Sequence, residues 1–180
     1  VIQEGEEATQ YDTLEGAFTA APDGATVQLL ADYELTSSIT RDKTLTLDLS
    51  EKTITVYIVA ESSTANAFIL TSNANFTLKN GKVVGAEKVN VTNNGTISSE
   101  TLKDNRAIKV TGGSVLIKNV TLGDFAAKTG NGAVVCAENG TVTIEDSSLG
   151  FYNRETKEQG YNFALNGGAV YTKDSTVTIQ

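Results

Sequence analysis

Apolar and polar residues alternate along most of the chain, and this two-residue period is typical of β-strands with one buried face. The segments with this period begin near Ala25, and their first apolar positions are Val27, Leu29, Leu45, Leu47, Leu49, Ile54 and Val56. Threonine fills many of the positions between them, as expected for the exposed face of a strand. The pattern predicts an all-β protein over residues 25–180.

One short stretch near the start departs from this period. Its apolar residues recur at the spacing of a helix face, and they are Leu14, Ala17, Phe18 and Ala21. Asp12 and Glu15 fit the two ends of a capping box with Asp12 as the N-cap, and Pro22-Asp23-Gly24 ends the helix. We expect residues 1–24 to form a lead-in and a capping helix over the open end of a β-stack.

An internal repeat organises the rest of the chain. Four segments begin with alanine in the same setting: Ala67-Phe68-Ile69-Leu70, Ala107-Ile108-Lys109-Val110, Ala133-Val134-Val135-Cys136 and Ala169-Val170-Tyr171-Thr172. A second strand follows each: Asn75-Phe76-Thr77-Leu78, Ser114-Val115-Leu116-Ile117, Thr141-Val142-Thr143-Ile144 and Thr176-Val177-Thr178-Ile179. A third short strand then comes at Val83, Leu122 and Leu149.

Equivalent positions of the repeats predict which side chains face the core. Lys109 is the third residue of its segment, so the third position should face water and the second and fourth the interior. This alignment places Cys136 in the core, equivalent to Leu70 and Val110. Each strand is too short to bury its face alone, whereas parallel stacking of equivalent strands gives a continuous core. Three stacked strands per turn predict a parallel β-helix, and an antiparallel sandwich is the alternative.

The repeats differ mainly in the segment between the third strand and the next alanine. These insertions are Tyr57 to Asn66, Ala86 to Arg106, Gly123 to Gly132 and Gly150 to Gly168. Since coils stack in register, the insertions should project from one edge, which is often the binding face of a solenoid. Aromatic and arginine side chains anchor many ligands, so Tyr152, Arg154 and Tyr161 are the candidate ligand-binding residues.

The composition of the chain argues against several kinds of partner and functional site. The net charge of −8 argues against a nucleic-acid partner or an anionic membrane surface. No stretch reaches the roughly 20 apolar residues of a membrane span, so we expect no direct membrane insertion. Histidine is absent and there is one cysteine, so we predict no nucleophilic triad, no cofactor and no metal site. The acidic residues Glu145-Asp146, Asp42 and Asp48 are most simply hydrated turn residues.

Two groups of motifs resemble known families. The segments Tyr11 to Phe18, Asp23 to Asp32, Thr46 to Leu49 and Lys52 to Thr55 resemble the opening of β-helix domains in large surface proteins of Gram-positive gut and oral bacteria. Phe163-Ala164-Leu165-Asn166 and the following Gly167-Gly168-Ala169-Val170 resemble motifs of chlamydial polymorphic outer-membrane adhesins and pectin-lyase-like surface proteins. The copy at Gly132-Ala133 departs from the motif, with Asn131 where the second glycine is expected.

The resemblance implies a right-handed parallel β-helix with three short strands per coil and a short N-terminal capping helix. Pectate lyases share that fold and use an arginine base beside calcium held by acidic residues. The chain offers Arg41, Arg106 and Arg154, and none is expected on a strand beside an obvious column of acidic residues, so no catalytic residue is carried over.

The function expected from these observations is a non-catalytic module of a bacterial cell surface, either extracellular and anchored or secreted. It would bind a host protein or glycan through its loop edge, or act as a structural spacer, with further domains after residue 180. The alternative is an N-terminal fragment of a pectin-lyase-like polysaccharide lyase or glycoside hydrolase.

Overall fold

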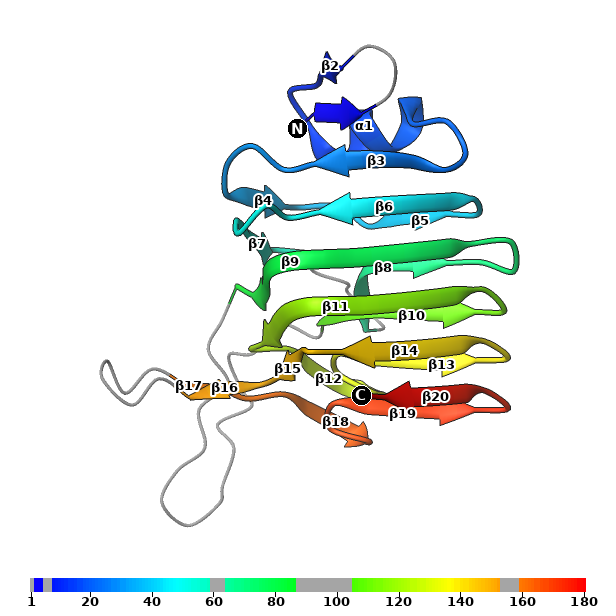
Figure 1. The fold of residues 1–180 in the computed structure, drawn as a ribbon. Helices are drawn as coiled ribbons and strands as arrows, with labels where there is room; N and C mark the ends of the chain where they lie inside the picture. The colour runs from blue at the N-terminus through cyan, green and yellow to red at the C-terminus, as the bar shows by residue number, and fades with distance from the viewer. Residues whose placement is uncertain (1, 5–7, 59–63, 87–104, 153–158) are drawn as a thin grey trace.

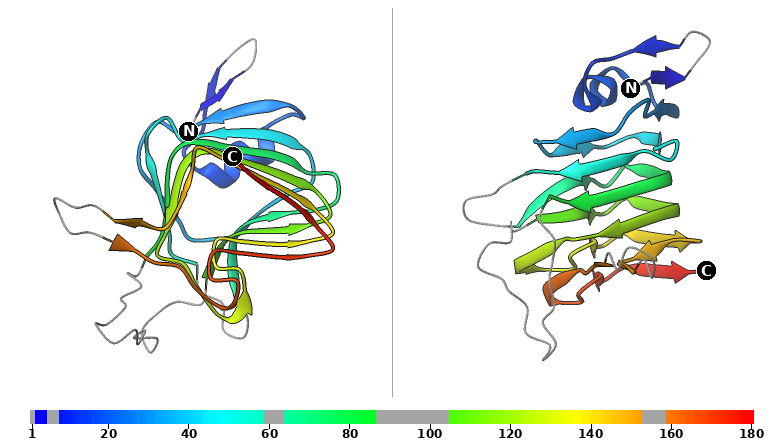
Figure 2. Two further views of the ribbon diagram at one scale, coloured as in Figure 1. Left: turned by 60° about the horizontal axis from the view of Figure 1, so that its bottom comes forward. Right: turned by 90° about the vertical axis from the view of Figure 1, so that its left-hand side faces the viewer.

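Mostly parallel strands lie one above another in stacked sheets, from the N-terminal helix at one end to the C-terminus at the other (Figure 1). The computed structural model describes residues 2–4, 8–58, 64–86, 105–152 and 159–180. Viewed towards the C-terminal end, successive passages of the chain superimpose around a common axis (Figure 2). Each passage contributes one layer to the stack, and neighbouring layers are joined by backbone hydrogen bonds between equivalent strands.

Among the described residues, eleven strands form the largest sheet. Its parallel part contains β3 (Ala25–Gln28), β4 (Tyr33–Leu35), β6 (Thr44–Asp48), β7 (Thr53–Val56), β9 (Asn75–Gly85), β11 (Ser114–Gly123), β14 (Thr141–Glu145), β15 (Ser148–Leu149) and β20 (Thr176–Ile179). Two antiparallel strands at its N-terminal end, β1 (Ile2–Glu4) and β2 (Thr9–Gln10), complete it. The long strands β9 and β11 each supply two consecutive strands of a layer, because their second halves pair with β7 and β15.

A second parallel sheet within the described residues contains β5 (Ile39–Arg41), β8 (Ala65–Leu70), β10 (Asn105–Thr111), β13 (Val135–Glu138) and β19 (Val170–Lys173). The chain alternates between this sheet and the larger one, so that each layer contains a strand of both. Two smaller pairs complete the fold: β12 (Ala126–Asn131) with β18 (Phe163–Asn166), and β16 (Phe151–Tyr152) with β17 (Gln159–Gly160).

The predicted register of the second strands is confirmed. Phe76, Val115, Val142 and Val177 pair in one column, and Leu78, Ile117, Ile144 and Ile179 pair in the next. The polar residues between them face outward, including a row of Thr26, Thr46, Thr77, Thr143 and Thr178 that Leu116 interrupts. The third-strand column of Val83, Leu122 and Leu149 is confirmed as well.

The predicted register of the first strands is wrong in one copy. Val135 pairs with Ile108 and Val170, and Cys136 pairs with Lys109 and Tyr171, so the alignment on Ala133 is one residue out. A slip of one residue turns each side chain to the opposite face of the sheet. The inward residues of β13 are therefore Val135 and Ala137. Cys136 is buried, but it lies outside the contiguous core, and its burial raises the pKa of the thiol.

The Asn-Gly turns set this register. Asn131 pairs with Asn166, and Gly132 and Gly167 after them have φ of 63° and 59°. A Cβ at either glycine would meet a backbone carbonyl oxygen, at 2.2 Å and 2.3 Å. Only glycine fits such a turn, so Gly132 corresponds to Gly167 and Asn131 to Asn166. Asn131 is therefore not a departure from the motif.

The helix α1 (Leu14–Ala20) caps the stack as predicted, but its N-cap is Thr13 and not Asp12. Thr13 has extended dihedral angles, and its hydroxyl accepts a 3.1 Å hydrogen bond from the backbone N–H of Gly16. The carboxylate of Glu15 does not return to the N-cap. It accepts hydrogen bonds from Tyr33 (2.6 Å) and Ser37 (2.7 Å), which tie the helix to the first layers.

The apolar face of α1 closes the end of the core. Phe18 is 3% exposed, and its ring lies 6.1 Å from the rings of both Phe68 and Phe76, measured between centroids. Arg41, on β5, donates to the backbone carbonyls of Phe18 (2.8 Å) and Ala21 (3.1 Å). These bonds satisfy carbonyl groups at the helix C-terminus that have no partner within the helix.

The segment from Gly123 to Gly132 is part of the stack and not a projecting insertion. It forms β12, which pairs with β18, and Phe125, Ala126 and Ala127 are buried. The alanine alignment starts each repeat at the following alanine. It therefore leaves Phe125, Ala126 and Ala127 outside the repeat, in a predicted loop.

Replacing Phe18 with alanine is expected to lower the free energy of unfolding by about 3–5 kcal/mol, because it leaves a cavity beside two phenylalanine rings. Chemical denaturation followed by circular dichroism measures this loss. Leu165→Ala is the matched control, since Leu165 is 67% exposed and its truncation should change stability little. A Phe18→Ala protein as stable as the control variant would contradict the role of the helix as a cap.

Candidate functional site

The chain bends between the second and third strands of a layer, and in four layers a polar residue at this bend has a left-handed backbone conformation. Ser50, Asn80, Asn119 and Asp146 have φ of 48°, 61°, 53° and 47°. Short polar residues tolerate this left-handed region because their side chains can form local hydrogen bonds. Asn80, Asn119 and Asp146 stack across the layers, because the residues before them pair in register. Ser50 lies in the longer bend of the preceding layer, where its neighbour Glu51 also has a positive φ of 64°. We call Ser50, Asn80, Asn119 and Asp146 the bend column.

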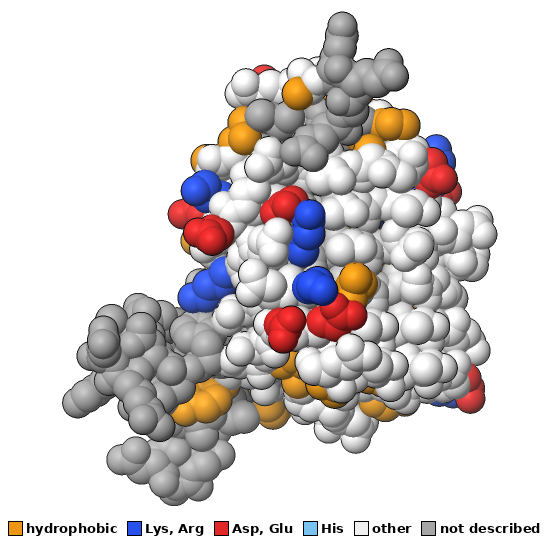
Figure 3. Space-filling view, viewed as in Figure 1, with side chains coloured by type: hydrophobic (Ala, Val, Ile, Leu, Met, Phe, Trp, Pro, Cys, Tyr) orange, Lys and Arg blue, Asp and Glu red, His pale blue; other side chains and the backbone are white. Residues whose placement is uncertain are grey.

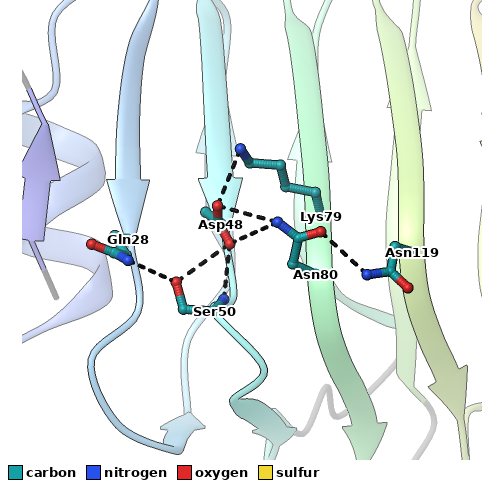
Figure 4. A network of polar contacts seen from close by, with 6 residues as sticks. All are labelled: Gln28, Asp48, Ser50, Lys79, Asn80 and Asn119. Atoms are coloured by element: carbon teal, nitrogen blue, oxygen red, sulfur yellow. Dashed lines mark hydrogen bonds and ion pairs between the residues drawn. The ribbon is translucent and has the colours of Figure 1, made fainter.

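Hydrogen bonds connect much of the bend column (Figure 4). Asp48 accepts hydrogen bonds from the backbone N–H of Ser50 (2.9 Å) and from the amide of Asn80 (3.2 Å), and it lies 3.1 Å from the ammonium of Lys79. The amide nitrogen of Asn119 donates to the amide oxygen of Asn80 at 3.3 Å. The Gln28 amide donates to the Ser50 hydroxyl at 2.9 Å. The network therefore joins the layers that contain β3, β6, β9 and β11.

The electrostatics of this network favour an ionised Asp48. Partial burial raises the pKa of Asp48, but the hydrogen bonds from Ser50 and Asn80 and the charge of Lys79 outweigh burial, and the net pKa is lowered. Further along the same outward face, Glu145 accepts from the ammonium of Lys118 at 2.8 Å. These carboxylates hold neighbouring layers together.

Two hollows lie along the outer side of the bend. One, of about 360 Å³, is lined by residues that include Glu51, Thr53, Lys82, Thr121, Asp146 and Ser148. The other, of about 310 Å³, is lined by residues that include Tyr11, Asp12, Leu30, Asp32 and Tyr33. The backbone N–H of Thr53 donates to the Asp32 carboxylate at 2.8 Å, which ties the bend of the first layer to β7.

Arg41 and Arg106 are both structural. Arg41 is 6% exposed and its guanidinium donates to backbone carbonyls of the capping helix. Arg106 is 5% exposed; it donates to the carbonyl of Gly132 at 2.7 Å and to the amide oxygen of Asn66 at 2.7 Å. A hollow of about 280 Å³ lies beside Arg41 and Glu15. The Glu15 carboxylate and the two Nη atoms of Arg41 are engaged by these helix and layer contacts, whereas the Nε of Arg41 is buried without a hydrogen-bond partner among the described residues.

The structure places two of the three residues proposed from the sequence at one hairpin. Tyr152 belongs to β16 and pairs with Gln159 of β17, and Tyr161 follows β17 with 36% of its surface exposed. Arg154 lies outside the described residues, so its place in the site stays a prediction.

Sequence reasoning missed Tyr11 and Tyr33 as candidate site residues. They lie on different elements, one before the capping helix and one on β4, and only the packing of the lead-in on the first layer brings them to one hollow. The alternation of β4 could have indicated that Tyr33 lies on the side opposite Glu34, but no local pattern links it to Tyr11.

Comparison of the chain with protein-family models, with curated proteins and with solved structures finds no match. In the part of the chain that the structure describes, no three His, Cys, Asp or Glu side chains are grouped so that they could hold a metal ion. Likewise, none of the described helices is both long and apolar enough to cross a membrane.

Acidification should destabilise the protein partly through Asp48 and Glu15, since hydrogen bonds lower the pKa of both carboxyls despite partial burial. A lowered folded-state pKa contributes stability above the unfolded value, about 4, and that stability is lost as the pH falls through the folded-state value. Denaturation midpoints measured from pH 7 to pH 2 should fall, and they should fall less in Asp48→Asn. An identical pH profile in the two proteins would contradict the assignment.

Proposed function

We propose that this chain is a non-catalytic module of a bacterial cell surface, extracellular and either anchored or secreted, that binds a host protein or glycan through loops at one edge. We further infer that its layers wind as a right-handed parallel β-helix of the pectin-lyase-like class. Parallel pairing of strands from successive layers supports this winding, and about 98% of crossover connections between parallel strands are right-handed.

The binding proposal rests on the observation that three insertions start from the same edge of the stack. They leave the stack after β7, β9 and β15, whose residues pair directly or through β11. The turns after them are also stacked, since the N–H of Ala86 donates to the Val56 carbonyl (3.0 Å) and that of Gly150 to the Leu122 carbonyl (2.6 Å). Loops that vary in length on a fixed edge are the usual binding surface of a solenoid.

The chemistry of the described charged groups favours a binding module over a lyase. A base must reach its substrate, but Arg41 and Arg106 are buried and bonded to the protein itself. Asp48, Glu15 and Glu145 likewise have partners that hold the fold together. These contacts favour a structural use of the charges.

The loops can be tested without disturbing the stack. Residues 88–103 and 153–158 would each be replaced by a short Gly-Ser linker, which leaves Arg106 and β18 in place because both belong to the stacked layers. Beads coated with the altered chain should lose adhesion to mammalian epithelial cells and to immobilised mucin. The thermal unfolding midpoint should stay within a few degrees of the unaltered protein.

The matched control carries Ser72→Ala and Asn73→Ala in the turn between β8 and β9, at a different corner of the stack. Adhesion of this control should equal that of the unaltered chain. Adhesion that survives both loop replacements would overturn the proposal, as would release of unsaturated or reducing sugars from a polysaccharide substrate.

A further inference from the structure

We propose that two copies of the chain associate through the free edge of β20, with the two β20 strands antiparallel about a two-fold axis. β20 pairs with β14 on one side, and none of the described strands pairs with it on the other (Figure 1). This self-association goes beyond the loop-mediated adhesion proposed above and does not depend on it. A dimer carries two of the loop edges in one particle, which raises the avidity of weak adhesion.

The backbone of β20 leaves hydrogen-bonding groups open at this edge. The N–H groups of Thr176 and Gln180 donate to carbonyl groups of the preceding layer at 3.0 Å and 2.9 Å, so these residues face β14. Successive residues of a strand direct their backbone groups to opposite sides. The N–H and C=O groups of Val177 and Ile179 therefore face the open edge, where a further strand can pair with them.

The edge of β20 lacks the features by which proteins usually prevent such pairing. Charged side chains, proline and very short strands protect the edges of sheets. β20 has no charged residue and no proline, whereas β19, the other end strand of this layer, contains Lys173. At the opposite end of the stack β2 has only two residues, and α1 covers the core. Pairing is therefore expected between two β20 edges and not head-to-tail.

Exposed apolar side chains and a low local charge favour a second copy as the partner. Val177 and Ile179 are 37% and 69% exposed although they occupy inward columns. Residues 163–180 contain one Lys and one Asp, while the whole chain carries a net charge of −8. Two copies of an acidic chain repel each other, and the repulsion is smallest where neutral surfaces meet. Figure 3 shows hydrophobic side chains along the lower, C-terminal end of the viewed face, with most charged side chains above them.

The sequence of β20 is self-complementary in one antiparallel register. When Thr178 lies opposite Thr178 of the second copy, each Val177 lies opposite an Ile179, so apolar residues meet on the core side of the sheet. The open N–H and C=O groups of Val177 and Ile179 then form the hydrogen-bonded pairs of the ladder, and the two Thr178 residues form the non-hydrogen-bonded pair on the axis. One strand pair buries much less than the roughly 1,600 Å² of a stable interface, so we expect a transient dimer.

Sedimentation velocity measures the association directly. The 180-residue chain should shift from monomer to dimer as its concentration rises from about 10 μM to about 1 mM. Ile179→Lys should abolish the shift because it places a charge at the paired edge, and it should leave the fold intact because Ile179 is largely exposed. Leu30→Lys is the matched control, since Leu30 is 40% exposed and follows β3 near the capped end. A chain that stays monomeric, or equal loss of dimer in the two variants, would overturn the proposal.

Disulfide formation tests the register. Thr178→Cys should give a covalent dimer under mild oxidation, because the Cα atoms of a non-hydrogen-bonded pair lie about 4.5 Å apart, within the range of a disulfide. Thr176→Cys is the matched control, exposed on the same strand but placed by this register roughly 14 Å from its equivalent. Both variants retain the buried Cys136. Equal yields from the two variants, or no covalent dimer with Thr178→Cys, would contradict this pairing. The loop replacements do not alter β20, so this association and the loop-mediated adhesion can fail separately.

Discussion

Burial of each layer's apolar residues by the layers next to it is the interaction on which the rest of the structure depends. The last strand shows this directly. Val177 and Ile179 occupy the same inward columns as Val142 and Ile144, yet they are 37% and 69% exposed, against 0% and 2% one layer earlier. The residue types are nearly the same and only the neighbouring layer differs. At the other end α1 provides that neighbour, with Phe18 over Phe68 and Phe76.

Because burial needs an aligned neighbour, features that repeat in every layer could be predicted from sequence and features that occur once could not. The inward columns of the second strands follow from alternation and spacing. The register of β13 could be predicted only by aligning Gly132 with Gly167, whose turn requires glycine. Alanine has no such conformational requirement, so an alignment on alanines does not define the register. The same number of residues separates Ile108 from Val115 and Val135 from Val142, a regularity that the alanine alignment hid.

The candidate site likewise has one part that the sequence repeats predict and another that they do not. Repeats located the edge from which insertions leave, because that edge is defined by stacked third strands. Composition could not locate the hollow beside Tyr11 and Tyr33, since these residues meet only when the lead-in packs on the first layer. The capping box was predicted wrongly for a related reason. The Glu15 carboxylate accepts hydrogen bonds from Tyr33 and Ser37, which are distant in sequence, and not from the start of its own helix.

The polar contacts along the bend explain why this surface is rigid. Asp48, Asn80 and Asn119 satisfy one another across layers, so the backbone of the bend is fixed without any ligand. Thr121 and Ser148, which line the hollow beside this column, are displayed on that fixed frame. The same stacking that holds the layers together therefore supplies a regular array of hydrogen-bonding groups on this side of the protein.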